Sequence, residues 1–369
     1  MHCQRATFSL ACFLFLNLQV SFVASAKTTF YRVGVMRRTF TPPEPYDWRD
    51  AKTHALITDI WYPADNTASE QTQWLGSPDN PFANAGKAAP NAALIAKPDK
   101  LPLILLSHGT GASSLMMGWL GTALASHGFV AAAVNHPGNN ALEAYTLPGF
   151  SLWWERATDL STILDQLLAD STFGPRIDSK RVGAAGFSLG GLTVIETAGG
   201  IAEISRYQDF CESPKADGMC GDPVEFPGLS AKIADLAKSD PAFQAALAGA
   251  AKSHRDPRIR AIFAMAPALG PAFDPASFAK ISIPTQIVAG TADKAVPIES
   301  SAKFFAANIH GAQLTLLQDV GHYTFLATCG VLGRTSRPDI CLDNAGILRD
   351  DIHAQTANLA RQFFESNLR

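Results

Sequence analysis

Apolar residues along this chain gather in short runs, and most runs are separated by segments with helical spacing. Continuous short runs predict strands that are buried on both faces of a sheet. They occupy residues 101–107, 128–135, 181–187, 258–267, 283–290 and 312–320. Two earlier segments, 28–40 and 54–62, are rich in β-branched and aromatic residues with partial alternation. These two predict opening strands that pair antiparallel.

Helix-compatible segments lie between the predicted strands. Residues 152–170 repeat apolar side chains at helical spacing, and 114–126 and 346–366 predict further helices, the last covering one face of the sheet. Residues 63–100 are rich in Pro, Asn, Ala and Gly and predict a long loop with at most a short helix. Alternating strands and helices predict an α/β fold whose mostly parallel sheet of about eight strands is flanked by helices.

Residues 200–256 interrupt this alternation. They hold two cysteines, a Pro/Gly-rich link and a helix-like segment, and they fall in a crossover between two predicted strands. We therefore expect a helical cap or lid inserted at about 200–256, rather than a second domain. Residues 27–369 as a whole are expected to form a single domain.

Residues 1–26 have the composition of a secretory signal peptide. A positive charge at Arg5 precedes a mostly apolar run over 8–23, and small residues lead up to Ala26. A membrane anchor is the alternative, but the run is short for a span and polar residues interrupt it. We expect cleavage after Ala26 and a secreted or periplasmic bacterial protein. No later segment of the mature chain is long and apolar enough for a transmembrane segment.

Composition and charge limit the classes of partner. Hydrophobic residues make up 47% of the chain and charged residues 17%, which suits a protein with a large core rather than a disordered chain. Thirty Lys and Arg residues against 33 Asp and Glu give a net charge of −3, and no dense basic run occurs. Nucleic acid is therefore not expected as a partner.

Export would make disulfides the natural state of the cysteines that remain after cleavage: Cys211, Cys220, Cys329 and Cys341. Four cysteines allow three pairings, and the sequence does not choose among them. The short separations favour 211–220 and 329–341. A metal site is the alternative, but no C-x-x-C pair or histidine cluster supports it, so we predict neither a metal nor a cofactor.

The segment 183–194, GAAGFSLGGLTV, places Ser188 between glycines where a predicted strand gives way to a helix. A serine among glycines is an ordinary turn in most proteins. The pattern G-x-S-x-G also puts a nucleophile on a sharp strand-to-helix bend. Asp293 and His322 each follow a later predicted strand, so the order along the chain is Ser, Asp, His. Parallel strands end at one edge of a sheet, and we therefore predict a catalytic triad of these three residues.

Two backbone amides are expected to bind the oxyanion. One belongs to Leu189, at the N-terminus of the helix after the serine, and the other to Thr110, in the glycine-rich segment SHGTGASS after residues 101–107. His108 is a rival for the catalytic base, but a histidine at this position more often orders the loop. His136 follows a predicted strand too, and we interpret it as loop-ordering or pocket-lining.

At these residues the chain resembles the α/β-hydrolase superfamily, and within it the bacterial proteins called predicted dienelactone hydrolases, relatives of platelet-activating-factor acetylhydrolases. The matching stretches are SHGTG, NHPGN, GAAGFSLGG, VAGTADKAVP and VGHYTFL. The resemblance implies a serine ester hydrolase with the triad Ser188, Asp293 and His322. Dienelactone hydrolases use a cysteine nucleophile where this chain has serine, so dienelactone is not expected as the substrate.

The sequence therefore predicts an exported serine esterase that acts on a small-molecule or lipid ester through an acyl-enzyme. Two enzymatic alternatives stay open, a lipase or phospholipase A2-like acyl-lipid hydrolase and a serine peptidase, because a triad does not distinguish ester from amide bonds. A binding protein on a hydrolase scaffold is the alternative from another class, although such a protein would have no need of the complete triad.

Overall fold

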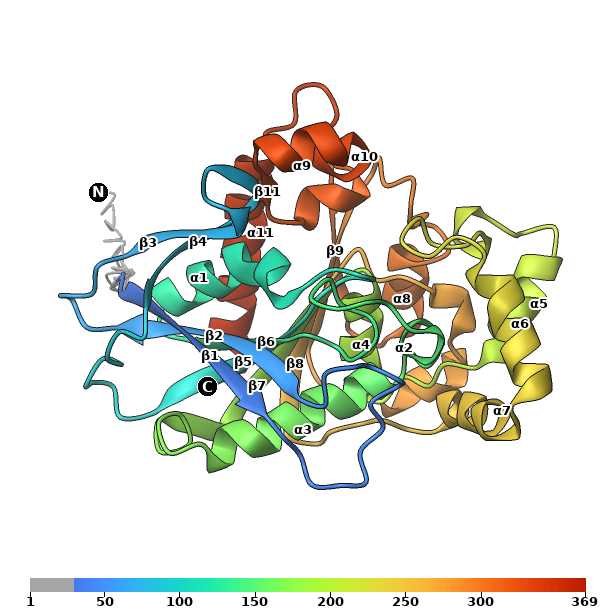
Figure 1. Ribbon diagram of the computed structural model, residues 1–369, viewed down its shortest axis with the longest axis horizontal. Coiled ribbons are helices and arrows are strands. Elements are labelled where there is room, and N and C mark those ends of the chain that lie inside the picture. Colours follow the sequence, from blue (N-terminus) through green and yellow to red (C-terminus); the bar gives the residue numbers. More distant parts are fainter. Residues whose placement is uncertain (1–29) are drawn as a thin grey trace, which may run out of the picture.

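The computed structural model describes residues 30–369, so the predicted signal peptide, residues 1–26, lies outside the described range. These residues form a layered α/β structure with an eleven-stranded mixed sheet at its centre. Figure 1 shows the sheet running through the molecule, with helices on both of its faces. The predicted α/β fold is confirmed.

Parallel strands form the middle of the sheet, and every strand predicted from the sequence is present. The parallel set runs in the order β10–β9–β8–β7–β5–β6, and β6, β2 and β1 then pair antiparallel. Their bounds are β1 Arg32–Phe40, β2 Leu56–Ala64, β5 Leu101–Ser107, β6 Val130–Val134, β7 Ile177–Phe187, β8 Ile259–Met265, β9 Thr285–Gly290 and β10 Gln313–Leu317. The carboxyl ends of β5, β7, β9 and β10 therefore lie along one edge of the sheet, as the predicted site requires.

The prediction of a loop over residues 63–100 was wrong. This region contains the hairpin of β3 (Gln71–Ser77) and β4 (Asn80–Pro90), and β11 (Thr328–Cys329) pairs with β4. Strand β4 has no β-branched residue, but its small side chains allow a helix to approach closely. A Cβ on Gly118 would lie 2.4 Å from the Ala85 carbonyl oxygen. Packing has thus outweighed the low intrinsic strand propensity of this segment.

Strand residues alternate between two apolar clusters, one on each face of the sheet. Leu103 and Leu105 pack with α3, α4 and α8, whereas Ile104 and Leu106 pack with α1 and α11. The predicted C-terminal helix is α11, and it covers the second face. The helix bounds are α1 Gly118–Ser126, α2 Leu147–Ser151, α3 Glu155–Ala169, α4 Leu189–Ala198, α8 Ala302–Asn308, α9 Val331–Ser336, α10 Pro338–Cys341 and α11 Arg349–Asn367.

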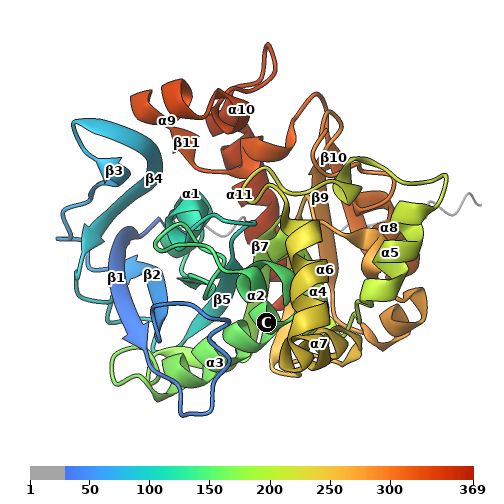
Figure 2. The ribbon, with the colours of Figure 1, turned by 45° about the vertical axis from the view of Figure 1, so that its right-hand side comes forward.

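The segment 200–256 forms a helical insertion between α4 and β8. It contains α5 (Ile204–Glu212), α6 (Leu229–Ser239) and α7 (Pro241–Leu247), and a disulfide joins Cys211 to Cys220. In Figure 2 the yellow insertion comes forward beside α2 and α4. Phe243 and Ala250 of the insertion pack on Trp154, which precedes α3. The insertion is thus held to the main domain by its own small apolar cluster.

Short 3₁₀ turns complete the described elements: η1 Ser114–Met117, η2 Gly218–Cys220, η3 Ala248–Ala251, η4 Gly270–Ala272, η5 Pro275–Lys280 and η6 His322–Phe325. A second disulfide joins Cys329 to Cys341, across α9 and α10. The structure thus has both of the short pairings that the cysteine spacing favours. Within residues 30–369, no helix combines the length and the apolar character needed to cross a bilayer.

Candidate active site

Ser188 stands on a sharp bend between β7 and α4, with backbone angles of φ 57° and ψ −118°. Such angles are costly for a residue with a side chain, and they persist only where the surroundings enforce them. The glycines allow the close contacts of the bend. A Cβ on Gly186 would lie 2.0 Å from the Gly190 carbonyl oxygen, and one on Gly190 would lie 2.0 Å from the Ser107 carbonyl oxygen. The bend therefore presents Ser188 beside the end of β5.

The structure brings the three residues of the predicted triad together. The His322 Nε2 lies 3.0 Å from the Ser188 Oγ, and the His322 Nδ1 lies 2.7 Å from the Asp293 Oδ2. Ser188 and His322 are buried. The other carboxylate oxygen of Asp293 accepts hydrogen bonds from the amides of Ala295 and Val296, at 3.0 and 2.7 Å. Asp293 is thus fixed by its own turn, with one oxygen left for the imidazole.

The loop that carries His322 is anchored to the C-terminal part of the chain. Thr324 donates a 2.7 Å hydrogen bond to Asp343, which pairs with the buried Arg349. The ring of His353 lies within 3.0 Å of the Thr324 and Leu326 carbonyl oxygens. These contacts fix η6 from behind, so the imidazole of His322 has little freedom to turn away from Ser188.

The amides of Thr110 and Leu189, predicted to bind the oxyanion, belong to two segments that lie close to Ser188. Leu189 is the first residue of α4, where the N–H groups of a helix have no intrahelical acceptor. Among the hydrogen bonds of residues 30–369, neither the Leu189 nor the Thr110 amide donates one. A Cβ on the neighbouring Gly109 would lie 3.4 Å from the Ser188 Cβ, so the loop after β5 runs beside the serine. Backbone amides without an acceptor are the kind of group that can stabilise an oxyanion.

His108 occupies a different place from the one a catalytic base requires. Its ring is fully buried and is hydrogen-bonded to the Gly109 carbonyl oxygen and to the backbone amide of His136. The imidazole that reaches Ser188 belongs to His322. The structure thus matches the loop-ordering interpretation of His108 and His136.

Two residues at the site were not singled out in the sequence. The Tyr145 hydroxyl donates a 2.8 Å hydrogen bond to the Gly111 carbonyl oxygen, and a Cβ on Gly111 would lie 3.0 Å from the Glu225 Cγ. Burial raises the pKa of Glu225, against the opposing effect of the positive Arg337. No motif surrounds either residue, and only the folding of the insertion over the 107–111 segment brings Glu225 there.

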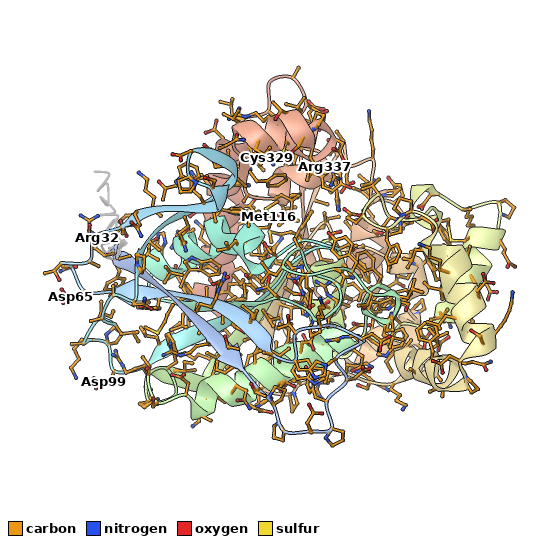
Figure 3. All side chains as sticks on the ribbon, viewed as in Figure 1. Arg32, Asp65, Asp99, Met116, Cys329 and Arg337 are labelled. Carbon is orange, nitrogen blue, oxygen red and sulfur yellow. A yellow bond between two sulfur atoms is a disulfide. The ribbon has the colours of Figure 1, made fainter. Side chains whose placement is uncertain are left out.

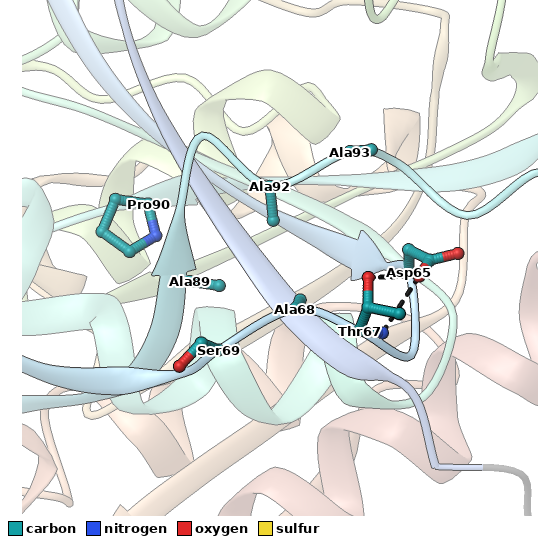
Figure 4. A pocket seen from close by; sticks show the side chains of 8 residues that line it. All are labelled: Asp65, Thr67, Ala68, Ser69, Ala89, Pro90, Ala92 and Ala93. Atoms are coloured by element: carbon teal, nitrogen blue, oxygen red, sulfur yellow. Dashed lines mark hydrogen bonds between the residues drawn. The ribbon is translucent and has the colours of Figure 1, made fainter.

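Two cavities on the surface lie apart from this site. One, of about 360 Å³, is lined by the small residues and polar turn of Figure 4, among them Asp65 and Ala92. The other, of about 560 Å³, lies between Arg37 and Trp74. Figure 3 places Asp65 at the end of the molecule opposite the insertion. Neither cavity is lined by a triad residue. Within residues 30–369, no group of three or more His, Cys, Asp or Glu side chains is arranged to hold a metal ion.

The protein has the α/β-hydrolase fold. This fold is defined by the strand order, by the sharp bend that carries the serine and by the hydrogen bonds that link the side chains of Ser188, His322 and Asp293. A solved structure described as a ferulic acid esterase from Streptomyces cinnamoneus aligns with a TM-score of 0.58 at 19% identity, over 94% of this chain and 92% of that one. At that identity the alignment establishes the fold alone.

Sequence comparisons give more particular relatives. Residues 81–149 match the family model "Platelet-activating factor acetylhydrolase, isoform II". Lipase 1 of Moraxella sp. (strain TA144) is 37% identical over 97 residues, which is 25% of this chain and 27% of that protein. The platelet-activating factor acetylhydrolase of Cavia porcellus is 28% identical over 169 residues, 35% of this chain and 36% of that protein. The chain thus spans only about a quarter to a third of these relatives.

The predicted resemblance to α/β-hydrolases related to platelet-activating-factor acetylhydrolases is confirmed by these matches. The family-model match includes the loop with Thr110 and the loop with His136, and it ends before Ser188. The relatives are, by name, hydrolases of carboxylic esters: a lipase, an acetylhydrolase and an esterase.

Proposed function

We propose that this protein is a serine hydrolase of carboxylic esters. The observation that carries the proposal is the hydrogen-bonded chain from Asp293 through His322 to Ser188, ending on a serine with strained backbone angles. A serine hydroxyl is a weak nucleophile unless a base takes its proton, and histidine titrates in the required range. The names of the related proteins support an ester rather than an amide as the substrate.

In the proposed mechanism, the Ser188 Oγ attacks the ester carbonyl carbon while its proton passes to the His322 Nε2. Asp293 accepts the Nδ1–H of the imidazole, fixes its tautomer and stabilises the imidazolium. The C–O bond to the alcohol then breaks, and His322 gives its proton to the leaving oxygen. Water attacks the resulting acyl-enzyme, again with His322 as base, and His322 then returns this proton to the Ser188 Oγ as the bond between the acyl carbon and Oγ breaks. The products are the carboxylic acid and free Ser188.

The negative oxygen of each tetrahedral intermediate would be bound by the amides of Thr110 and Leu189. Their lack of any other acceptor supports this role. Loss of one such donor typically costs about 100- to 1000-fold in rate. The oxyanion-binding site formed by these two amides would therefore account for a large share of the rate enhancement that the proposed chemistry needs.

The insertion would shape the substrate site as a cap. The Phe226 ring lies 5.1 Å from that of Phe150, and Glu225 reaches Gly111, so this part of the insertion lies over the loop of Thr110. A lipid-type acyl group is a second candidate for the substrate, because a lipase is among the relatives. A series of esters with increasing acyl length separates a short-acyl esterase from a lipase.

Export to an oxidising compartment is part of the proposal. It is supported by the apolar N-terminal sequence before Ala26 and by the two disulfides. Cleavage is checked by N-terminal sequencing of the protein recovered from a secreting host. A mature chain that begins at Lys27 is expected, and an intact N-terminus would contradict it.

The direct test is Ser188→Ala, assayed by release of p-nitrophenol from esters of two to eight carbons. We expect turnover to fall by about 10⁴-fold or more with an unchanged far-UV spectrum, because the variant lacks the hydroxyl on which the proposed acyl-enzyme forms. A fluorophosphonate probe should label the wild type and leave the variant unlabelled. The matched control is Ser213→Ala, in the insertion. A folded Ser188→Ala variant that retains activity would overturn the proposal.

A further inference from the structure

A second chain of serine, histidine and aspartate lies behind the proposed oxyanion loop. The Ser107 Oγ lies 2.9 Å from the His136 Nε2, and the His136 Nδ1 lies 2.7 Å from the Asp159 Oδ2. These distances resemble those of the triad. All three side chains are fully buried, however, so no substrate can reach Ser107. Any role of these three side chains must therefore be exerted through their hydrogen bonds to neighbouring groups of the protein.

The charges at this cluster fix the direction of each hydrogen bond. Burial and the nearby Arg156 lower the pKa of His136 to about 3, so the ring is neutral. Burial opposes ionisation of Asp159, but the positive Arg49 and the hydrogen bond from His136 together outweigh it and lower the pKa of Asp159 to about 2. An ionised carboxylate only accepts, so the His136 Nδ1 carries the hydrogen. The Nε2 is then an acceptor, and Ser107 donates to it.

His136 in turn determines the tautomer of His108. The backbone N–H of His136 donates to the His108 Nε2 over 3.2 Å, so that nitrogen must carry a lone pair. The hydrogen of the neutral His108 ring is then on Nδ1, which lies 2.7 Å from the Gly109 carbonyl oxygen and donates to it. The side chains of Ser107 and Asp159 hold the His136 ring, and thereby the backbone amide that makes this contact.

The carbonyl group of Gly109 and the amide of Thr110 belong to one peptide unit. In a trans peptide the C=O and N–H bonds point in opposite directions. Holding the Gly109 oxygen against His108 therefore directs the Thr110 N–H away from the buried cluster. On either side of this peptide the loop is fixed as well: Arg156 donates to the His108 carbonyl oxygen, and the Gly111 amide donates to Asn139 over 2.7 Å. Between these two fixed points, the Thr110 amide donates to no acceptor within residues 30–369.

We propose that His136, clamped between Ser107 and Asp159, is a positioning residue that sets the orientation of the Thr110 amide through His108. This inference rests on the proposed ester hydrolysis, because the amide matters only if an oxyanion forms beside Ser188. The positioning acts on the transition state and leaves the substrate-bound ground state unchanged, so it raises kcat rather than lowering KM.

The test compares His136→Gln and Ser107→Ala with the wild type on p-nitrophenyl butyrate. We expect kcat to fall about 10- to 100-fold in His136→Gln and less in Ser107→Ala, with KM within about twofold. A trifluoromethyl ketone, which forms a tetrahedral adduct with an oxyanion, should bind more weakly in proportion to the loss of kcat/KM. The shape of the pH–rate profile should not change, because His322 remains the base.

Two controls separate positioning from loss of stability. His310→Gln makes the same replacement at an exposed histidine and should leave kcat unchanged. Phe278→Leu alters a buried ring that packs against Phe273, Phe304 and Phe305; it should lower the melting temperature and leave kcat per folded molecule unchanged. Ser107→Ala keeps the His136 ring, so it serves if His136→Gln does not fold.

Two outcomes would overturn the inference. One is a folded variant with the kcat of the wild type, and the other is a loss of kcat that leaves ketone binding intact. A wild type that hydrolyses no ester would instead overturn the proposed function, and this result is distinguishable because it precedes any comparison of variants.

Discussion

Asp293 separates its two carboxylate oxygens between two tasks. One oxygen closes its own turn through the Ala295 and Val296 amides, and the other accepts from His322. Because the two oxygens have different partners, a change at the oxygen that faces His322 can alter the hydrogen bonding of the imidazole without unfolding the turn. Single substitutions in the triad should therefore lower kcat without lowering the stability of the fold.

Asp293→Asn is the sharpest such change. If the amide oxygen of the introduced asparagine still accepts from the turn, the amide NH₂ group faces the His322 Nδ1. The Nδ1 must then accept a hydrogen bond, and the hydrogen of the neutral ring moves to Nε2. The imidazole can no longer take the proton of Ser188, and kcat should fall by about 10⁴-fold. The measurement is kcat on p-nitrophenyl butyrate together with the melting temperature. Asp319→Asn, at the surface, is the control. Wild-type kcat in Asp293→Asn would contradict the proposed role of the carboxylate.

Among single residues, those of the triad could be predicted because each lies in a recognisable local sequence pattern. Glycines on both sides of Ser188, and the position of Asp293 and His322 after strands, were sufficient to select three residues that the fold brings together. The chain Ser107–His136–Asp159 was not predictable, because its members lie at the end of a strand, in a loop and within a helix. Nothing in their spacing indicates that the three side chains meet.

At the scale of elements, each disulfide lies behind one loop of the triad. Met219, next to Cys220, packs against Val296, whose amide binds Asp293. The Asp217 carboxylate, on the same turn, accepts a hydrogen bond from Ser300. The bridge Cys329–Cys341 spans the segment that follows the His322 loop. The bridges therefore link peripheral helices to the loops where position matters most.

Removal of the first bridge by Cys211→Ala with Cys220→Ala should loosen the turn η2 and with it the packing on Val296. A loop of this length corresponds to about 3 kcal/mol of unfolding free energy in the chain-entropy picture. We expect that loss, together with a several-fold lower kcat, measured by urea unfolding and steady-state kinetics. Val224→Ala, exposed in the same insertion, is the control. An unchanged kcat would show that the bridge stabilises the fold without bracing Asp293.

Elements with strong periodicity were predicted well, and the hairpin of β3 and β4 was not. Its residues are those of loops, and the strand state comes from partners far away in sequence: α1, β1 and β11. The insertion shows the same limit. Its helices follow from local pattern, whereas the approach of Glu225 to Gly111 depends on how the whole segment folds back.

For the molecule as a whole, buried neutral histidines determine how stability depends on pH. Burial lowers the pKa of His353 to about 4 and that of His136 to about 3, and it lowers the pKa of His108 well below its usual value. An unfolded chain binds these protons below about pH 6.5, and the folded chain does not. Their stabilising effect is therefore complete above that pH and is lost as the pH falls. Glu196 and Glu225, whose pKa values are raised by burial, act in the opposite sense, but they are two groups against three histidines.

We therefore expect the melting temperature to fall by about 5 °C or more between pH 7.5 and pH 5. His353→Gln should reduce this dependence, because the amide can still donate to the carbonyl oxygens of the His322 loop without binding a proton. The measurement is a series of thermal melts at constant ionic strength, with His310→Gln as the control. A melting temperature that is highest at pH 5 would contradict the assignment.

The pairing of β11 with β4 has a consequence for how the chain is made. Residues 328–329 pair with residues 83–84 and continue the side of β4 that β1 occupies further along. A nascent chain that lacks its last part thus leaves this side of the hairpin open, and open strand edges recruit other chains. We therefore expect the C-terminal segment to limit self-association during synthesis. A protein truncated after the His322 loop should accumulate as aggregates even though its parallel sheet is complete, because this strand edge and the sheet face under α11 would both be exposed.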